Sequence, residues 1–202
     1  LRGPPVAITS GESASMSSLV RRPGIRAAML GQFVIFANIG IFDSTIDLYL
    51  EDLGASNTTI GIVLLLLGAP LLVLPTPAGT WVERIGPRRV LVPLLIAAGP
   101  AIAGFGMFPI VATIAIAGLV QGALESVIFP TTQLLALEES GAEKAATGQA
   151  VLGVTGLAAA GVTAFIAPSI YEAVGARPVF ATMGAFSLFS AALAARQLRQ
   201  MD

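Results

Sequence analysis

The stretch GTWVERIGPRR, residues 79–89, interrupts a long apolar part of the chain with charge. Apolar segments flank it at residues 58–78 and 89–108, and each has about the length that one membrane crossing requires. Within the stretch, Gly86 and Pro87 form a pair that favours a tight turn. We therefore expect a polar loop that joins two membrane spans, carrying the charged residues Glu83, Arg84, Arg88 and Arg89.

The composition of the whole chain favours a membrane protein. Hydrophobic residues make up 55% of the 202 residues and charged residues 11%, whereas roughly a quarter of an ordinary soluble domain is charged. The mean hydropathy is +0.84. The chain has no cysteine and no histidine, which excludes disulfides, Ser-His catalysis and His-ligated metals. The net charge of −1 gives no reason to expect a nucleic-acid partner.

Hydropathy along the chain predicts an all-α membrane protein with six transmembrane helices. Residues 1–22 are rich in Gly, Pro and Ser, and we expect them to form a flexible cytoplasmic tail ahead of a transmembrane domain over residues 23–202. The expected spans cover residues 25–50, 58–78, 89–108, 109–137, 145–170 and 178–195.

The distribution of Lys and Arg predicts the orientation of these spans. If the N-terminus is cytoplasmic, every Lys and Arg except Arg177 lies at a cytoplasmic loop or helix end. This bias predicts a multi-pass protein of the plasma (inner) membrane with both termini in the cytoplasm. The stretch 79–89 is then a cytoplasmic loop.

The spacing of Gly79, Glu83, Arg84, Gly86 and Arg88 resembles the signature loop of the major facilitator superfamily (MFS permeases). In that family the loop ties two helices together on the cytoplasmic side and helps to gate alternating access. The resemblance implies a motif and gating role for these residues, together with Arg89. Two positions depart from the family pattern, because Glu83 replaces the usual Asp and Pro87 stands at a usually basic position.

A weaker copy of the stretch occurs later in the chain. VERIGPRRVL at 82–91 aligns with YEAVGARPVF at 171–180, matching Glu83 with Glu172, Gly86 with Gly175, Arg88 with Arg177 and Val90 with Val179. Transporters of the resembled family carry inverted three-helix repeats within each six-helix half. The copy therefore predicts two inverted three-helix repeats and explains the single external arginine.

The resemblance covers one six-helix half, whereas such transporters have two. The approach SLVRRPGIRAAMLGQFVIF, residues 18–36, is typical of the end of a central linker, and we expect the C-terminal half of a transporter. The partners would be the lipid bilayer, a small-molecule substrate and a second six-helix half. That half could come from the same gene, from a split partner or from a homodimer. The alternative is a truncated or structural remnant that does not transport by itself.

Two acids on the first span are candidates for substrate or proton binding. Asp43 and Asp47 are four residues apart and therefore lie on one face of the helix, and Asn38 lies on the same span. Charged groups inside a membrane are costly and mark functional sites by default. The alternative is a solvated outer helix end, continuous with Glu51 and Asp52.

Glu125 is the deepest acid in the chain, near the middle of the fourth span, and Gln121 lies one turn before it. No Lys or Arg lies at comparable depth, which favours a neutral carboxyl. Glu125 and Gln121 are therefore candidates for proton coupling or for binding a polar or cationic substrate. The alternative is a hydrogen bond between helices inside the bundle.

These features favour a secondary active transporter that moves a small molecule by alternating access, with proton-coupled efflux as one form. No phosphate-binding Gly-x-x-x-x-Gly-Lys-Ser/Thr sequence occurs, and we expect no cofactor, no metal and no enzymatic activity. An intramembrane enzyme is disfavoured because histidine is absent and because Asp43 and Asp47 share one helix near its outer end.

Overall fold

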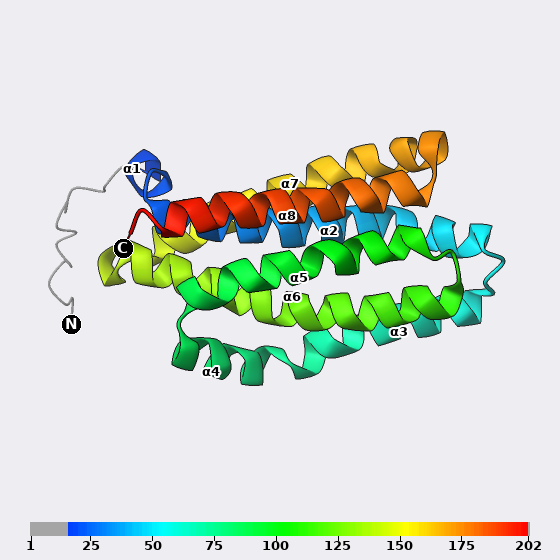
Figure 1. The fold of residues 1–202 in the computed structure, drawn as a ribbon, viewed down its shortest axis with the longest axis horizontal. Coiled ribbons are helices and arrows are strands. Elements are labelled where there is room, and N and C mark those ends of the chain that lie inside the picture. Colours follow the sequence, from blue (N-terminus) through cyan, green and yellow to red (C-terminus); the bar gives the residue numbers. More distant parts are fainter. Residues whose placement is uncertain (1–15, 202) are drawn as a thin grey trace, which may run out of the picture.

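A computed structural model describes residues 16–201, and the elements it contains in that range are helices (Figure 1). The helices run in the order α1 (Met16–Val20), α2 (Pro23–Asp52), α3 (Asn57–Val73), α4 (Pro75–Ile85), α5 (Pro87–Met107), α6 (Val111–Ser140), the short 3₁₀ turn η1 (Ala142–Lys144), α7 (Ala145–Val174) and α8 (Ala176–Leu198).

The helices α2, α5, α6, α7 and α8 are each long and apolar enough to cross a membrane. A sixth span results if α3 and α4 count as one, although they meet at a bend of 48°. Pro75 explains the break, because proline cannot donate the helical hydrogen bond and its ring displaces the preceding turn. The chain therefore has up to six spans, one of them broken.

The expected loop at residues 79–89 differs from the structure, because its first part is helical. Helix α4 continues through Ile85, and prolines at Pro75 and Pro77 favour its first turn. The helix ends at Gly86, which has a φ of 94° that favours glycine and whose N–H donates to the carbonyl of Val82 at 2.8 Å. Only Gly86 separates α4 from α5.

The expected flexible tail, residues 1–22, also differs in its described part. Residues 1–15 lie outside the described residues. Met16–Val20 form helix α1 instead of an irregular tail, and the side chain of Leu19 is completely buried. Burial of an apolar side chain can hold so short a helix, which would not be stable alone.

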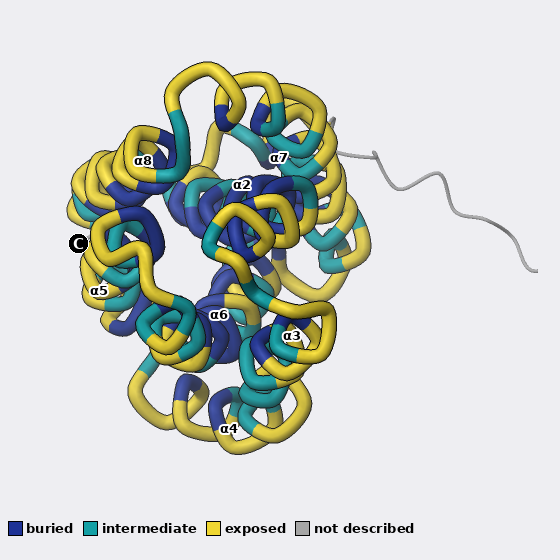
Figure 2. The backbone as a smooth tube through the Cα atoms, turned by 90° about the vertical axis from the view of Figure 1, so that its right-hand side faces the viewer, coloured by how far each residue is buried: buried dark blue, intermediate teal, exposed yellow. Residues whose placement is uncertain are grey.

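The spans form two layers, which the end-on view shows clearly (Figure 2). One layer contains α3, α6, α2 and α7 in that order, and α5 and α8 pack against α6 and α2 from one side. Exchanging α2 with α6, α3 with α7 and α5 with α8 maps the main packing pairs onto one another. The pair α2–α7 becomes α6–α3, and α5–α6 becomes α8–α2. The packing therefore has the symmetry of two inverted three-helix repeats.

Glycines let the helices approach closely at the crossings of this bundle. A Cβ atom on Gly40 of α2 would lie 2.9 Å from the Cα of Ala160 in α7. A Cβ on Gly184 of α8 would lie 2.5 Å from the carbonyl oxygen of Gly99 in α5. Small residues at helix crossings are the usual basis of close packing in membranes. These contacts fix the positions of α2 and of the polar side chains it carries.

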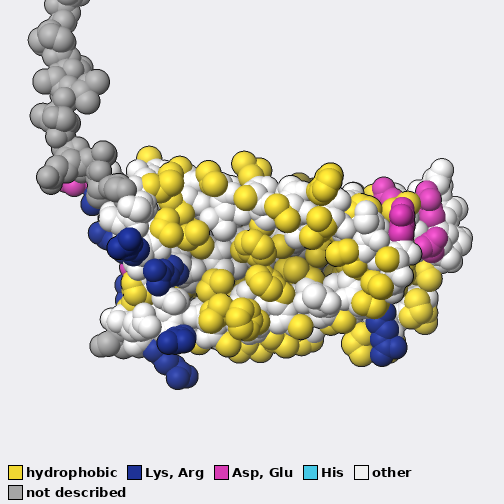
Figure 3. Space-filling view, turned by 90° about the horizontal axis from the view of Figure 1, so that it is seen from above, with side chains coloured by type: hydrophobic (Ala, Val, Ile, Leu, Met, Phe, Trp, Pro, Cys, Tyr) yellow, Lys and Arg dark blue, Asp and Glu magenta, His cyan; other side chains and the backbone are white. Residues whose placement is uncertain are grey.

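The two ends of the bundle differ in charge (Figure 3). Basic side chains gather at the end where α2 begins and α8 finishes, whereas acidic side chains gather at the opposite end. At that acidic end, Tyr171 donates a hydrogen bond to the carboxylate of Asp52 at 2.6 Å. Tyr49 donates to the carbonyl of Phe105 at 3.0 Å. The long axis of the bundle therefore runs between a basic end and an acidic end.

Candidate functional site

The crossing of α2 and α6 brings three of the predicted candidates together. The side-chain amide of Asn38 donates to Oε1 of Glu125 at 2.8 Å, and the amide of Gln121 donates to the same oxygen at 3.1 Å. All three side chains are buried. Gln121 and Glu125 share a face of α6 because they are one helical turn apart. The carboxyl of Glu125 is thus held between two amides.

This cluster borders a cavity of about 170 Å³ that also reaches Asp43. Asp43 lies on α2 and is exposed, so it marks the open side of the cavity, whereas Glu125 lies at its buried side. The remaining wall is apolar. The cavity is lined by Asn38, Ile39, Phe42, Asp43, Leu67, Leu71, Phe105, Gln121 and Glu125, which belong to α2, α3, α5 and α6.

The cluster leaves hydrogen-bond acceptors without donors. Both amides direct their NH₂ groups to Glu125, and Oδ1 of Asn38 and Oε1 of Gln121 are buried without a partner among the described residues. Buried polar atoms normally have partners, so these two oxygens require an explanation. No Lys or Arg is among the residues that line the cavity. The site therefore offers acceptors and negative charge, which suit a hydrogen-bond donor or a cation.

The other polar residues of these two helices lie apart from the cavity. Thr132 of α6 donates to Oε1 of Gln32 on α2 at 2.9 Å, which forms a second polar link between the helices. Asp47 is exposed and does not line the cavity. Of the two aspartates considered from the sequence, the structure brings only Asp43 to the Glu125 cluster.

At the basic end, Arg88 forms an ion pair that was not predicted from the sequence. Its Nη2 lies 2.6 Å from Oε1 of Glu139 at the end of α6. The carbonyl oxygen of Glu139 accepts a further hydrogen bond from the Arg22 guanidinium, just before α2. Gly24 leaves room for the acid, because a Cβ there would lie 2.9 Å from Glu139 Oε1. Glu139 therefore joins the ends of three helices, α2, α5 and α6.

The remaining motif residues have less contact than the sequence suggested. Glu83, Arg84 and Arg89 are exposed, and none of them forms an ion pair within residues 16–201. A Cβ on Gly79 would meet no atom within 4 Å, so Gly79 does not bring two helices together in this part of the chain. An ion pair between Arg88 of α5 and Glu139 of α6 links two helices at this end of the bundle. The sequence contained one indication of this ion pair, because Glu138 and Glu139 follow the fourth predicted span on the same side of the membrane as the basic residues at 84–89.

The repeated sequence at 171–180, like the motif, has a glycine with positive φ between two helices. Gly86 has φ 94° and ψ 130°, and Gly175 has φ 79° and ψ 178°. Each ends one helix and precedes the next, and the Gly175 N–H donates to the carbonyl of Tyr171 at 2.7 Å. The matched glycines therefore form equivalent hinges at opposite ends of the bundle.

Comparison with known families gives one match. The family model for the Major Facilitator Superfamily matches residues 28–200, which is nearly the whole of the described bundle. No curated protein sequence matches the chain.

Proposed function

The chain belongs to the Major Facilitator Superfamily, whose members are membrane transporters, and from this premise we propose that it is one six-helix half of a secondary active transporter. The complete transporter would contain a second half and would move a small molecule by alternating access. The buried carboxyl of Glu125 at the edge of a cavity is the observation that carries this proposal.

We propose that Glu125 either couples transport to protons or binds the substrate. A carboxyl at membrane depth is costly and is retained where it serves a pathway. Here it receives both amide donors on one oxygen, which leaves its second oxygen without a hydrogen-bond partner among the described residues. That oxygen can take up a proton or contact a cation. Gain and loss of a proton by Glu125 would link transport to a proton gradient.

The chemistry of the cavity favours a substrate that donates hydrogen bonds. The unpaired oxygens of Asn38 and Gln121 accept such bonds, and Asp43 supplies charge at the open side. The apolar wall, with Phe42 and Leu67 among its members, suits a hydrophobic body. We propose a small amphipathic amine or a similar cation as the substrate class.

The contacts at the basic end suit a gate. Arg88 and Glu139 fasten α5 to α6, and Arg22 adds the start of α2. Alternating access that also shifts helices within one half would form such contacts in one state and weaken them in the other. We propose that this arginine–glutamate pair stabilises one of the two access states, with the basic end in the cytoplasm and both termini on that side.

A purely structural role for Glu125 is the competing explanation, because a hydrogen bond between helices would also place it at the α2–α6 crossing. Under that explanation the chain could be a remnant without transport. The unpaired acceptors favour function, since a bundle built for stability alone gains nothing by leaving two buried amide oxygens unsatisfied.

Uptake measurements on Glu125→Gln test the proposal. The chain would be reconstituted with its second half in vesicles, and uptake of a fluorescent amine would be measured against external pH. Glutamine keeps the size and the amide contacts but cannot exchange a proton, so we expect loss of the pH dependence and a fall in uptake of about a hundredfold.

The matched control is Glu138→Gln, which removes an exposed acid from the same helix. It should leave the pH profile unchanged. Natural uptake and an unchanged pH profile in Glu125→Gln would remove this carboxyl from the mechanism and leave the structural explanation.

A further inference from the structure

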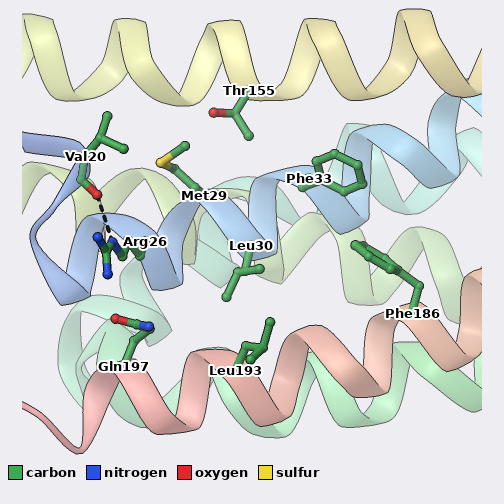
Figure 4. Close-up of a pocket in the computed structure, with 9 residues that line it drawn as sticks. All are labelled: Val20, Arg26, Met29, Leu30, Phe33, Thr155, Phe186, Leu193 and Gln197. Atoms are coloured by element: carbon green, nitrogen blue, oxygen red, sulfur yellow. Dashed lines mark hydrogen bonds between the residues drawn. The ribbon is translucent and has the colours of Figure 1, made fainter. Parts of the chain in front are cut away.

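A second cavity lies at the basic end, away from the Glu125 site. Its volume is about 370 Å³, and it is open to the outside of the bundle between α1, α2, α7 and α8 (Figure 4). The lining is apolar except at one end. It consists of Val20, Arg26, Met29, Leu30, Phe33, Thr155, Phe186, Leu193 and Gln197.

The polar end of this groove has an unused cation and an unused acceptor. Arg26 is exposed, and its Nε donates to the carbonyl of Val20 at 3.1 Å. Its other two guanidinium nitrogens have no hydrogen-bond partner within residues 16–201. Oε1 of Gln197 is buried and lacks a donor in the same range. Arg26 and Gln197 lie at the same end of the groove in Figure 4. Together they can bind an anionic group that also carries a hydroxyl or other donor.

The apolar part of the groove continues along the bundle. Phe33 and Phe186 face each other with ring centroids 5.2 Å apart, and both also line a third cavity of about 480 Å³ between α7 and α8. From Arg26 to Phe33 is about 10 Å along α2, and from Arg26 to Ile41 about 22 Å, at a rise of 1.5 Å per residue. One leaflet of the hydrocarbon core is about 15 Å thick. An acyl chain of one leaflet therefore fits along this path.

We infer that the groove between α1, α2, α7 and α8 binds an anionic phospholipid of the phosphatidylglycerol type. Its phosphate would lie against the Arg26 guanidinium, a headgroup hydroxyl would donate to Gln197, and one acyl chain would pass over Leu30 toward Phe33. Basic pockets between helices at this depth suit anionic headgroups. Charge complementarity selects this occupant, because the described residues that line the groove include one cation and no acid.

This site is separate from the proposed transport site. The lipid groove shares no residue with the cavity around Glu125. Its lipid would also hold together elements that have little direct contact, since α7 and α8 pack only weakly on each other. The site is therefore testable by binding alone, whatever the fate of the transport proposal.

Native mass spectrometry of the full chain with added phosphatidylglycerol tests the inference. Arg26→Gln removes the cation and should weaken lipid binding about tenfold, which is the effect of losing one charged hydrogen bond. Arg84→Gln removes an exposed arginine on α4 and should leave binding unchanged. Phosphatidylcholine with the same acyl chains should bind the natural chain about tenfold more weakly, because it lacks both the net charge and the hydroxyl.

A groove-filling variant provides a second test that keeps the charge. Leu193→Trp places a larger apolar group in the acyl path and should also reduce phosphatidylglycerol binding, while Arg26 remains. The inference is overturned if Arg26→Gln binds phosphatidylglycerol as tightly as the natural chain, if Leu193→Trp does so, or if phosphatidylcholine binds equally well.

Discussion

Glu139, near the end of α6, contacts Arg88 at the start of α5 and Arg22 just before α2. Its side chain is 11% exposed and that of Arg88 is 46% exposed, so the ion pair is only partly shielded from water. Exposed ion pairs contribute up to about 1 kcal/mol, and long side chains lose entropy when they are held. The pair is therefore suited to a contact that has to break and re-form, and less suited to a permanent support.

At the residue scale we predict a modest coupling between these two side chains. In a double-mutant cycle with Arg88→Gln and Glu139→Gln, the coupling free energy of unfolding should be about 0.5–1 kcal/mol in favour of the natural pair. Thermal unfolding in detergent measures it. The neighbouring Glu138→Gln, an exposed acid, serves as the control and should show no coupling with Arg88→Gln. A coupling near zero for Glu139 would mean that the pair does not fasten α5 to α6.

At this scale the sequence indicated which polar residues lie inside the membrane, but it did not indicate which residues contact one another across helices. The depth of Glu125 followed from its place in an apolar run, and its neighbour Gln121 followed from helical spacing. Glu139 was missed because it is far from Arg88 along the chain, and only the packing of α5 on α6 brings them together. Asp43 and Asp47 share a face of α2, but only Asp43 lines the cavity, because Asp47 lies one turn further along the helix.

At the scale of the helix pair, Gly40 should be intolerant of a methyl group. A Cβ there would press into the backbone of α7 at Ala160, which cannot move away as a flexible side chain can. Gly40→Ala should therefore destabilise the bundle by about 1–3 kcal/mol, the usual cost of overpacking. Thermal unfolding of the purified chain measures the loss.

Gly61→Ala is the matched control for Gly40→Ala. Gly61 also lies inside a helix, α3, but a Cβ there meets no atom within 4 Å. Alanine should leave stability within about 1 kcal/mol of the natural protein, or raise it slightly, because alanine favours helix. Equal effects at the two positions would contradict the tight α2–α7 contact.

Helix boundaries were predictable where the chain changes from apolar to polar, but not where a bend divides an apolar segment into two helices. The apolar runs predicted the spans, because a bilayer requires long helices. The break between α3 and α4 was not predicted, since residues 58–78 are mostly apolar and their prolines do not all break a helix. Pro70 lies inside α3, whereas α4 begins at Pro75. Helix α4 was not predicted for a different reason. The charged residues after Gly79 suggested a loop, although Glu83 and Arg84 lie on a helix.

At the scale of the whole molecule, the open side of the Glu125 cavity should contact water in the assembled transporter. The chain has no cysteine, so a single introduced cysteine gives an unambiguous signal. Ile39→Cys lies on the cavity wall and should react with a membrane-impermeant thiol reagent. Phe189→Cys, 59% exposed on α8, should be protected by lipid and should not react.

Labelling in intact vesicles that contain both halves measures this accessibility. Substrate should slow labelling of Ile39→Cys, because it would occupy the same cavity. Equal protection of the two positions would mean that the α2 face with Asp43 contacts lipid or protein and not an aqueous pathway.

The matched turns at Gly86 and Gly175 show that the fold of a three-helix unit and its orientation in the membrane depend on different residues. Both turns use a glycine with positive φ between two helices although they lie at opposite ends of the bundle, so this shared feature contains no information about the side of the membrane. The flanking charge differs, because Arg84 and Arg89 of one copy align with Ala173 and Pro178 of the other. Two three-helix units with this kind of turn thus lie in opposite directions within one bundle. During biosynthesis the direction of each unit is decided by a few side chains that contribute little to the fold.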